Sequence, residues 1–357
     1  MANVFLVDLE PVETRYTAQW KEHVPELLRK AGHNVQILAG PKDIPSATTP
    51  GAFLNFGGTN IYKSLQVEGM GRLFCSGSVS PGDHFLFTDA WHPGIINLKY
   101  MSELLGIPVK IHALWHAGSY DPHDFLGRLI GDTPWVRHAE KSFYHAIDYN
   151  YFATEFHIDL FAKNLLGYED AKVIKQFAPN KIVRTGWPMD YMQDTLAPYK
   201  NMEKRDLVLF PHRIAPEKQV EIFRDLQRQL PQYEFVVCQD QQLSKDEYHK
   251  LLGQAKVVFS ASLQETLGIG CYEGAIVDAI PMVPDRLSYS EMYENIFLYP
   301  SEWTESWRSY NQHRESVCNL IVQHMKNYDM VKFLIRRQAR TLTEKFFSAT
   351  DLLNNVR

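Results

Sequence analysis

The stretch Arg29-Lys-Ala-Gly-His-Asn-Val-Gln-Ile-Leu38 decides how the first half of the chain folds. An amphipathic segment over residues 16–30 predicts a helix, and Ala31-Gly-His33 is a typical helix stop. The apolar run Val35–Leu38 follows at once and predicts a strand, as does Val4–Val7 ahead of the helix. A strand, a helix and a second strand in this order are typical of a parallel β-α-β unit.

The same alternation continues through the 357 residues. It predicts further strands at 84–87, 109–114, 147–153, 207–210, 233–238, 257–260 and 280–283, and helices at 216–230, 246–254 and 266–278. A break at Gly186 and Pro188 separates two such series. The sequence therefore predicts an α/β protein with two Rossmann-like domains facing across a cleft. We expect an N-terminal domain over 1–185, a C-terminal domain over 186–330, and a C-terminal helix, 331–357, that packs back on the N-terminal domain.

The composition excludes several classes of protein. Hydrophobic residues make up 45% and charged residues 22% of the chain, which argues against disorder. A formal net charge of −5 weakly opposes a dedicated nucleic-acid binder. The four cysteines form no C-x-x-C pair, which excludes a zinc ribbon and disfavours a disulfide scaffold. No apolar run is long enough to span a bilayer, and the N-terminus lacks the basic region of a signal peptide, so we expect a cytoplasmic protein.

The sharpest chemical pattern is Glu265-Thr-Leu-Gly-Ile-Gly-Cys-Tyr-Glu273. It follows a predicted buried strand and opens a predicted helix, whose N-terminus favours a phosphate group. Gly268 and Gly270 allow the backbone to approach a ligand closely, and the glutamates can accept hydrogen bonds from sugar hydroxyls. From the spacing alone, an ordinary strand–turn–helix explains the pattern equally well.

A second pattern, Phe210-Pro-His-Arg-Ile-Ala-Pro-Glu-Lys-Gln219, follows the first strand of the second domain. Pro216 is suited to begin a helix. Arg213 and Lys218 can direct two cations at one diphosphate, Arg213 as a bidentate fork and Lys218 as a point charge. Either cation alone is better explained by a solvated salt bridge. Two cations in the same domain as the glutamate pair favour a binding site.

Together these residues resemble the retaining glycosyltransferases of the GT-B fold, which use nucleotide sugars and carry an E-x7-E motif. Glu265 and Glu273 match that motif, and Arg213-x4-Lys218 matches the family's diphosphate-binding pair. The resemblance implies that Glu265 is catalytic and contacts the donor sugar, that Glu273 holds the ribose, and that both cations stabilise the leaving diphosphate. The remaining residues of the implied donor site are Thr266, Leu267 and Gly268.

The first half resembles the family at fewer positions. His116, at the end of a predicted strand, resembles the family's donor-contacting histidine and is the second implied catalytic residue. Candidates on the acceptor side are Asp89, His92 and Trp115.

The chain also departs from the family pattern at two positions. His212 stands where the family often has glycine, and Asp8–Arg15 replaces a Gly-Gly loop after the first strand. Gly57-Gly58 can serve as a substitute backbone cradle or form a plain turn.

We expect no metal and no cofactor beyond the nucleotide sugar. His112 and His116 have H-x3-H spacing, but four residues of strand separate them by about 13 Å. A hydride-transferring dehydrogenase is disfavoured because no G-x-G-x-x-G follows the first strand.

The resemblance implies an enzyme that moves a sugar from a nucleoside diphosphate to a hydroxyl acceptor. Phage enzymes that glycosylate 5-hydroxymethylated DNA bases share this fold, so duplex DNA is one candidate partner, and the host cytoplasm is then the location. Trp91, Trp115 and Trp135 are candidates for stacking on a flipped base. A lipid, a polysaccharide or a small metabolite stays open as acceptor. A nucleotide-sugar 2-epimerase of the same fold and a non-enzymatic nucleotide-sugar sensor stay open as functions.

Overall fold

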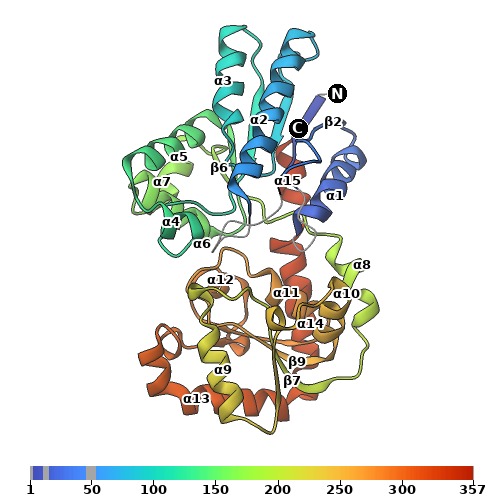
Figure 1. Cartoon of the computed structure of the whole chain (residues 1–357), viewed down its shortest axis with the longest axis vertical. Coiled ribbons are helices and arrows are strands. Elements are labelled where there is room, and N and C mark those ends of the chain that lie inside the picture. Colours follow the sequence, from blue (N-terminus) through green and yellow to red (C-terminus); the bar gives the residue numbers. More distant parts are fainter. Residues whose placement is uncertain (1–2, 11–15, 46–53, 357) are drawn as a thin grey trace. The chain divides into compact units, whose positions relative to one another are not determined.

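The structure, a computed structural model, describes residues 3–10, 16–45 and 54–356 (Figure 1). The chain forms two compact units. Unit 1 comprises Met1–Pro188 together with Ala349–Arg357, and unit 2 comprises Met189–Ser348. Part of the unusual first loop, residues 11–15, lies outside the described residues.

The described part of unit 1 contains a six-stranded parallel sheet in the order β2-β1-β3-β4-β5-β6. Its strands are β1 (Asn3–Val7), β2 (Asn34–Leu38), β3 (His84–Phe87), β4 (Lys110–Leu114), β5 (Tyr149–Phe152) and β6 (Ile182–Arg184). Its helices are α1 (Tyr16–Lys30), α2 (Phe56–Cys75), α3 (Gly94–Leu104), α4 (Phe125–Leu129), α5 (Pro134–Ala146), α6 (Glu155–Phe161), the π-helix η1 (Ala162–Leu166), α7 (Lys172–Phe177) and α15 (Thr350–Asn355). Every strand predicted for this half is confirmed, and so are the bounds of α1.

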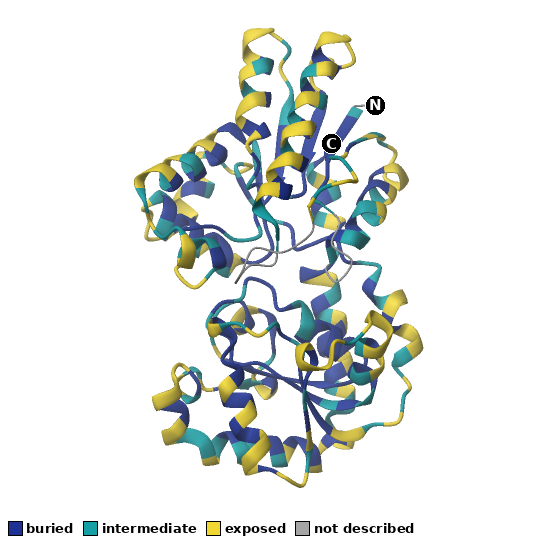
Figure 2. Cartoon of the chain, viewed as in Figure 1, coloured by how far each residue is buried: buried dark blue, intermediate teal, exposed yellow. Residues whose placement is uncertain are grey.

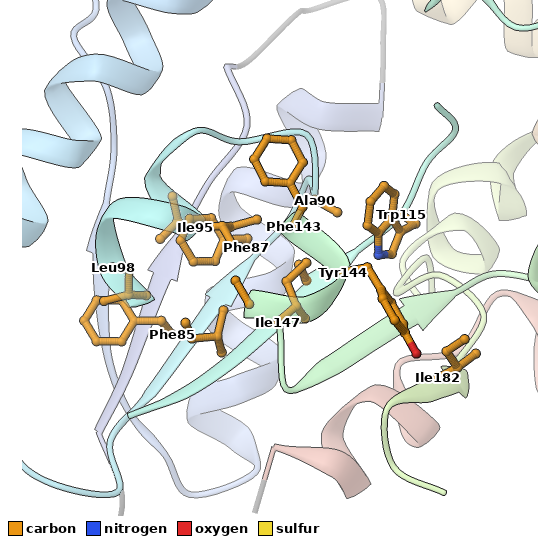
Figure 3. Close-up of a cluster of buried hydrophobic side chains, with 14 of the residues drawn as sticks. Phe85, Phe87, Ala90, Ile95, Leu98, Trp115, Phe143, Tyr144, Ile147 and Ile182 are labelled. Atoms are coloured by element: carbon orange, nitrogen blue, oxygen red, sulfur yellow. The ribbon is translucent and has the colours of Figure 1, made fainter. Parts of the chain in front are cut away.

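The core of unit 1 lies where helices cover the central strands. Phe85 and Phe87 of β3 are fully buried and pack with Ile147 and with Phe143 of α5 (Figure 3). Fully burying a side chain of this size stabilises the fold by about 1.5–3 kcal/mol. Unbroken apolar runs are expected in parallel strands that are covered on both faces. Figure 2 shows this contrast, with dark blue strands and yellow outer faces on α2 and α3.

The described part of unit 2 contains a five-stranded parallel sheet in the order β11-β10-β9-β7-β8. Its strands are β7 (Arg205–Phe210), β8 (Glu234–Val237), β9 (Ala255–Phe259), β10 (Ile280–Pro284) and β11 (Leu298–Tyr299). Its α-helices are α8 (Met192–Leu196), α9 (Val220–Gln229), α10 (Lys245–Gln254), α11 (Ile269–Ile276), α12 (Tyr289–Met292), α13 (Trp307–Lys326) and α14 (Tyr328–Phe346). Its 3-10 helices are η2 (Ala197–Tyr199), η3 (Pro216–Lys218), η4 (Cys238–Gln241), η5 (Asn295–Phe297) and η6 (Ser301–Trp303). Because β7 and β9 are neighbours and parallel, the loops that follow them meet at one edge of the sheet.

Two predicted helices of unit 2 differ from the structure. The helix predicted at 266–278 begins only at Ile269, because Gly268 adopts a left-handed backbone with φ 73°. A Cβ atom at Gly268 would lie 2.6 Å from Cε1 of Tyr289, so only glycine fits there. The helix predicted at 216–230 is divided at Gln219, where φ is 53°. The side-chain amide of Gln219 donates to the backbone oxygens of Ala261 and Thr304, both at 2.6 Å, which holds this conformation.

The predicted fold class, α/β with two parallel sheets, is confirmed. Gly57 and Gly58 lie in the first turn of α2, where the Asn55 side chain accepts from the Gly58 amide at 2.8 Å. They are therefore part of a capped helix start. None of the helices in the described ranges is both long and apolar enough to cross a membrane.

The packing of α11 on β9 gives a test of the fold. A Cβ atom at Gly274 would lie 2.5 Å from Cγ2 of Val258, whereas one at Gly71 of α2 would meet no atom within 4 Å. We expect Gly274→Ala to lower the free energy of unfolding by about 1–3 kcal/mol through overpacking. Gly71→Ala is the control and should raise it by about 0.5–1 kcal/mol. Calorimetric melting measures both, and an unchanged midpoint for Gly274→Ala would show that the contact is looser than described.

Candidate active site

The loop after β7 carries the first group of predicted donor-site residues. His212 is buried, and its ring packs edge-on against Phe210 at 5.1 Å between centroids. The next residue, Arg213, is partly exposed and forms an ion pair with the buried carboxylate of Glu217. The short helix η3 then ends at Lys218, which is buried. The two predicted cations therefore lie on one loop in different environments, Arg213 near solvent and Lys218 inside.

Lys218 joins the loop after β7 to the loop after β9. Its Nζ atom lies 3.0 Å from Oε2 of Glu265 and also donates to the backbone oxygen of Gln264. The Lys218 side chain is 7% exposed and that of Glu265 is 19% exposed. The ion pair is thus largely removed from water, where its charges attract each other more strongly than at a surface.

The carboxylate of Glu265 is held in its charged form. Burial raises the pKa of this group, but several contacts outweigh burial and bring the pKa below its ordinary value. They are the positive charge of Lys218, interaction with His212, the hydrogen bond from Lys218, and one from the Gly268 amide. Glu265 is therefore an ionised acceptor beside the N-terminus of α11, which is the state needed to bind a hydroxyl group.

Glu273 lies in α11 and is also buried, but its surroundings differ. Its Oε2 atom accepts a hydrogen bond of 2.6 Å from the hydroxyl of Tyr248 in α10. Burial raises the pKa of Glu273, the Tyr248 hydrogen bond and the charge of Lys245 partly offset burial, and the resulting pKa is about 7. The two glutamates of the motif thus have pKa values shifted in opposite directions.

The sequence pattern did not identify two residues that complete this arrangement. His212 interacts electrostatically with both Lys218 and Glu265, and only its departure from the family pattern had drawn attention to it. Tyr248 lies on a different helix from Glu273, and no spacing signal connects the two. Thr266 and Leu267 are buried in the loop that leads to Gly268, and their donor-binding role stays a prediction.

In unit 1, His116 lies just after β4, and both of its ring nitrogens have partners. Nε2 lies 2.7 Å from the backbone oxygen of Thr88, which only accepts, so this nitrogen carries the proton. Nδ1 therefore accepts from the Tyr16 hydroxyl at 2.6 Å. The ring also packs against Trp187, with 4.6 Å between centroids. These contacts fix the orientation of His116 at the carboxyl edge of the sheet.

Asp89 follows β3 and pairs with Lys63 at 3.1 Å. Its carboxylate also accepts from the Trp91 amide at 3.0 Å. Burial raises the pKa of Asp89, but Lys63, His116 and the amide outweigh burial and lower the pKa to about 2. Asp89 is therefore a charged group that interacts with His116, and its place on the acceptor side stays a prediction.

His92 and Trp115 lie deeper than an acceptor-side role requires. His92 bonds to Gln66 at 2.9 Å through Nε2 and accepts from the Gly94 amide at 2.9 Å through Nδ1. Trp115 is fully buried in the core of Figure 3, and its indole donates to Asn150 at 2.8 Å. Its ring offers no exposed face to a ligand, so the expectation that it stacks on a base is wrong. His92 is held by the fold in the same way.

The histidines at 112 and 116 do not form a metal site among the residues described. His112 bonds instead to His84, at 2.9 Å, and to the hydroxyl of Tyr151. In the described ranges, no group of three or more histidine, cysteine, aspartate or glutamate side chains is arranged to hold a metal ion.

The fold is similar to that of several solved GT-B glycosyltransferases, although the sequence matches no protein-family model and no curated protein. The catalytic domain of starch synthase IV from Arabidopsis thaliana, bound to ADP and acarbose, matches with a TM-score of 0.57 at 12% identity, over 99% of this chain and 97% of that one. Sucrose-phosphate synthase from Thermosynechococcus elongatus matches with a TM-score of 0.60 at 11% identity, over 99% and 97%. HepE from Anabaena, in complex with UDP, matches with a TM-score of 0.58 at 11% identity, over 98% and 97%. At such identities the likeness establishes the GT-B fold.

The raised pKa of Glu273 predicts a particular pH dependence of stability. Between about pH 4.5 and 7 the unfolded chain loses this proton and the folded chain keeps it, so the free energy of unfolding falls as pH rises. Glu273→Gln removes the cost of ionising the buried group. The variant should match the wild type near pH 4.5 and exceed its stability by about 1–3 kcal/mol above pH 7.

Urea unfolding at a series of pH values measures this difference. Glu344→Gln, at an exposed position of α14, is the control and should track the wild type throughout. Parallel profiles for the wild type and Glu273→Gln would mean that the pKa of Glu273 is not raised.

Proposed function

We propose that the protein is a retaining glycosyltransferase that moves a sugar from a nucleoside diphosphate to a hydroxyl acceptor. The observation that carries this proposal is the buried ion pair between Lys218 and Glu265 at the start of α11. It places a cation and an ionised acceptor side by side, next to a helix N-terminus. The cation and the helix N-terminus suit a diphosphate, and the ionised carboxylate suits a sugar hydroxyl.

Lys218 retains capacity for a phosphate. An ammonium group has three N–H donors, and the contacts to Glu265 and Gln264 use two of them. The third can donate to a phosphate oxygen while the other two stay in place. Arg213 on the same loop would add a second cation, and its partly exposed position allows it to turn toward a ligand.

In the proposed reaction, the diphosphate leaves from the same face of the donor sugar that the acceptor attacks. The positive charges and the helix amides would stabilise the negative charge that develops on the leaving group. Glu265 would orient the donor sugar and Glu273 the ribose. Among the similar structures, that of starch synthase IV holds ADP and that of HepE holds UDP, which supports a nucleoside diphosphate as a ligand of this protein. We propose no metal, since the cations and amides already supply the neutralising charge.

For the acceptor, we propose a 5-hydroxymethylated base in duplex DNA. Trp135 at the start of α5 is 59% exposed, so a large aromatic face is available to stack on a base. Trp91 is a weaker candidate because its indole is held by a hydrogen bond to Glu140. A polysaccharide, a lipid or a small metabolite as acceptor, and a 2-epimerase reaction, are the outcomes that a test must separate.

The first test combines substitutions with a panel of donors. Glu265→Gln and Arg213→Ala should each lower turnover about a hundredfold or more, because each removes a preorganised charge at the reacting centre. The matched controls are Glu234→Gln and Arg224→Ala, since both residues form exposed ion pairs in the same unit. Release of nucleoside diphosphate and product mass are followed with hydroxymethylated DNA, lipid, polysaccharide and no acceptor. Donor converted without an acceptor would indicate the epimerase, and unimpaired variants would remove these residues from the mechanism.

The second test concerns metal ions. Turnover should persist in excess EDTA, because Arg213, Lys218 and the amides at the start of α11 are proposed to neutralise the diphosphate. The measurement compares initial rates with and without the chelator, and with Mg²⁺ or Mn²⁺ added back. Complete loss of activity that either ion restores would overturn this part of the proposal.

A further inference from the structure

His212 combines burial with an unused hydrogen-bonding atom. The residue is 8% exposed, and its Nε2 atom is shielded from solvent and has no hydrogen-bond partner in the structure. It lies close enough to Lys218 and Glu265 for their charges to affect it. We infer that His212 is a specificity-determining residue whose Nε2 atom accepts a hydrogen bond from a hydroxyl group of the donor sugar. This inference rests on the proposed function.

The protonation of the ring defines what Nε2 can bind. Burial and, to a smaller extent, the charge of Lys218 lower the pKa of His212 to about 3, so the ring is neutral near pH 7. The backbone oxygen of Phe259 forms a hydrogen bond with the ring. A carbonyl oxygen only accepts, and Nε2 has no partner, so the proton is on Nδ1. Nε2 is therefore an acceptor.

A hydrogen-bond acceptor at this position favours contact with the sugar of a nucleotide sugar over contact with its diphosphate. An ionised diphosphate has no O–H group to donate, and it would favour a positively charged imidazole. A sugar hydroxyl donates readily, and leaving a buried acceptor unpaired costs about 1–3 kcal/mol. Lys218 is suited to the phosphate and Glu265 to the sugar, so an uncharged acceptor beside both belongs with the sugar.

A buried, unpaired nitrogen is not sufficient by itself, as His324 of α13 shows. His324 is also 8% exposed, and its Nε2 atom also lacks a partner. Burial alone lowers its pKa, to about 4, with no contribution from a charged neighbour. The two histidines therefore share their burial and differ in their neighbours, which makes His324 a matched control.

The experiment compares binding of UDP with binding of nucleotide sugars by isothermal calorimetry. The probes are UDP and UDP-, ADP-, GDP- and TDP-glucose, and the nucleotide sugar that the wild type binds most tightly is carried forward with its nucleoside diphosphate and its monodeoxy-sugar analogues. His212→Ala should weaken binding of the nucleotide sugar about 3–10-fold, the worth of one neutral hydrogen bond. Binding of the nucleoside diphosphate should stay within twofold. His212→Gln, whose side-chain oxygen can accept, should recover part of the loss, and His324→Ala should change neither affinity.

The monodeoxy analogues locate the hydroxyl. One analogue should bind the wild type more weakly than the parent sugar, and His212→Ala should no longer distinguish the two. Equal losses for the nucleoside diphosphate and the nucleotide sugar, or no loss for either, would overturn the role of His212 and leave the proposed function standing. A wild-type protein that binds no probe would overturn the proposed function, and the inference with it.

Discussion

Burying an ammonium and a carboxylate together costs several kcal/mol for each ion. The loops of unit 2 offset this cost for Lys218 and Glu265 because they supply further hydrogen bonds to both groups. The Lys218 ammonium also donates to the backbone oxygen of Gln264, and the Gly268 amide bonds to Glu265. These contacts are made only if the loop after β7 and the loop after β9 keep fixed positions relative to each other. The ion pair is therefore a constraint on the backbone of both loops.

Contacts that do not involve the ion pair hold the two loops together. The Leu263 amide donates to the backbone oxygen of Glu217 at 2.7 Å. The Gln219 side chain, which follows β7, donates to the backbone oxygen of Ala261, which follows β9. The guanidinium of Arg286, which follows β10, donates to the backbone oxygens of Ala261 and Ser262, both at 2.8 Å, and so fixes the loop after β9 itself. The hydrogen bonds of the Gln219 side chain offset the strain of its left-handed backbone. The loops are thus preorganised before any ligand binds, which is the condition for electrostatic stabilisation of a leaving group.

The elements that the sequence predicted well are those determined by residues close together in the chain. The strands of both sheets other than β6 and β11, which were not predicted, follow from apolar periodicity, and the whole of α1 follows from the same periodicity and from a glycine stop at Gly32, where φ is 92°. The late start of α11 and the division at Gln219 have tertiary causes, a contact with Tyr289 and bonds to distant carbonyls. No window of sequence contains those partners. Likewise Trp115 and His116 are adjacent in sequence, yet one is in the core and the other at the edge of the sheet.

The same distinction separates site residues from structural residues, because residue type alone does not tell what a side chain contacts. The motif spacing predicted Arg213, Lys218 and Glu265 as site residues, whereas His92 was predicted on the strength of being a histidine after a strand. The structure shows that Gln66 and the Gly94 amide use both nitrogens of His92, so a ligand would have to displace contacts that the fold already provides. His212 has one nitrogen without a partner beside an ion pair. A ligand that supplies the missing donor gains a hydrogen bond and removes the cost of an unpaired buried acceptor. The unpaired nitrogen of His212 can therefore contribute more to the free energy of binding than the nitrogens of His92, which already have partners.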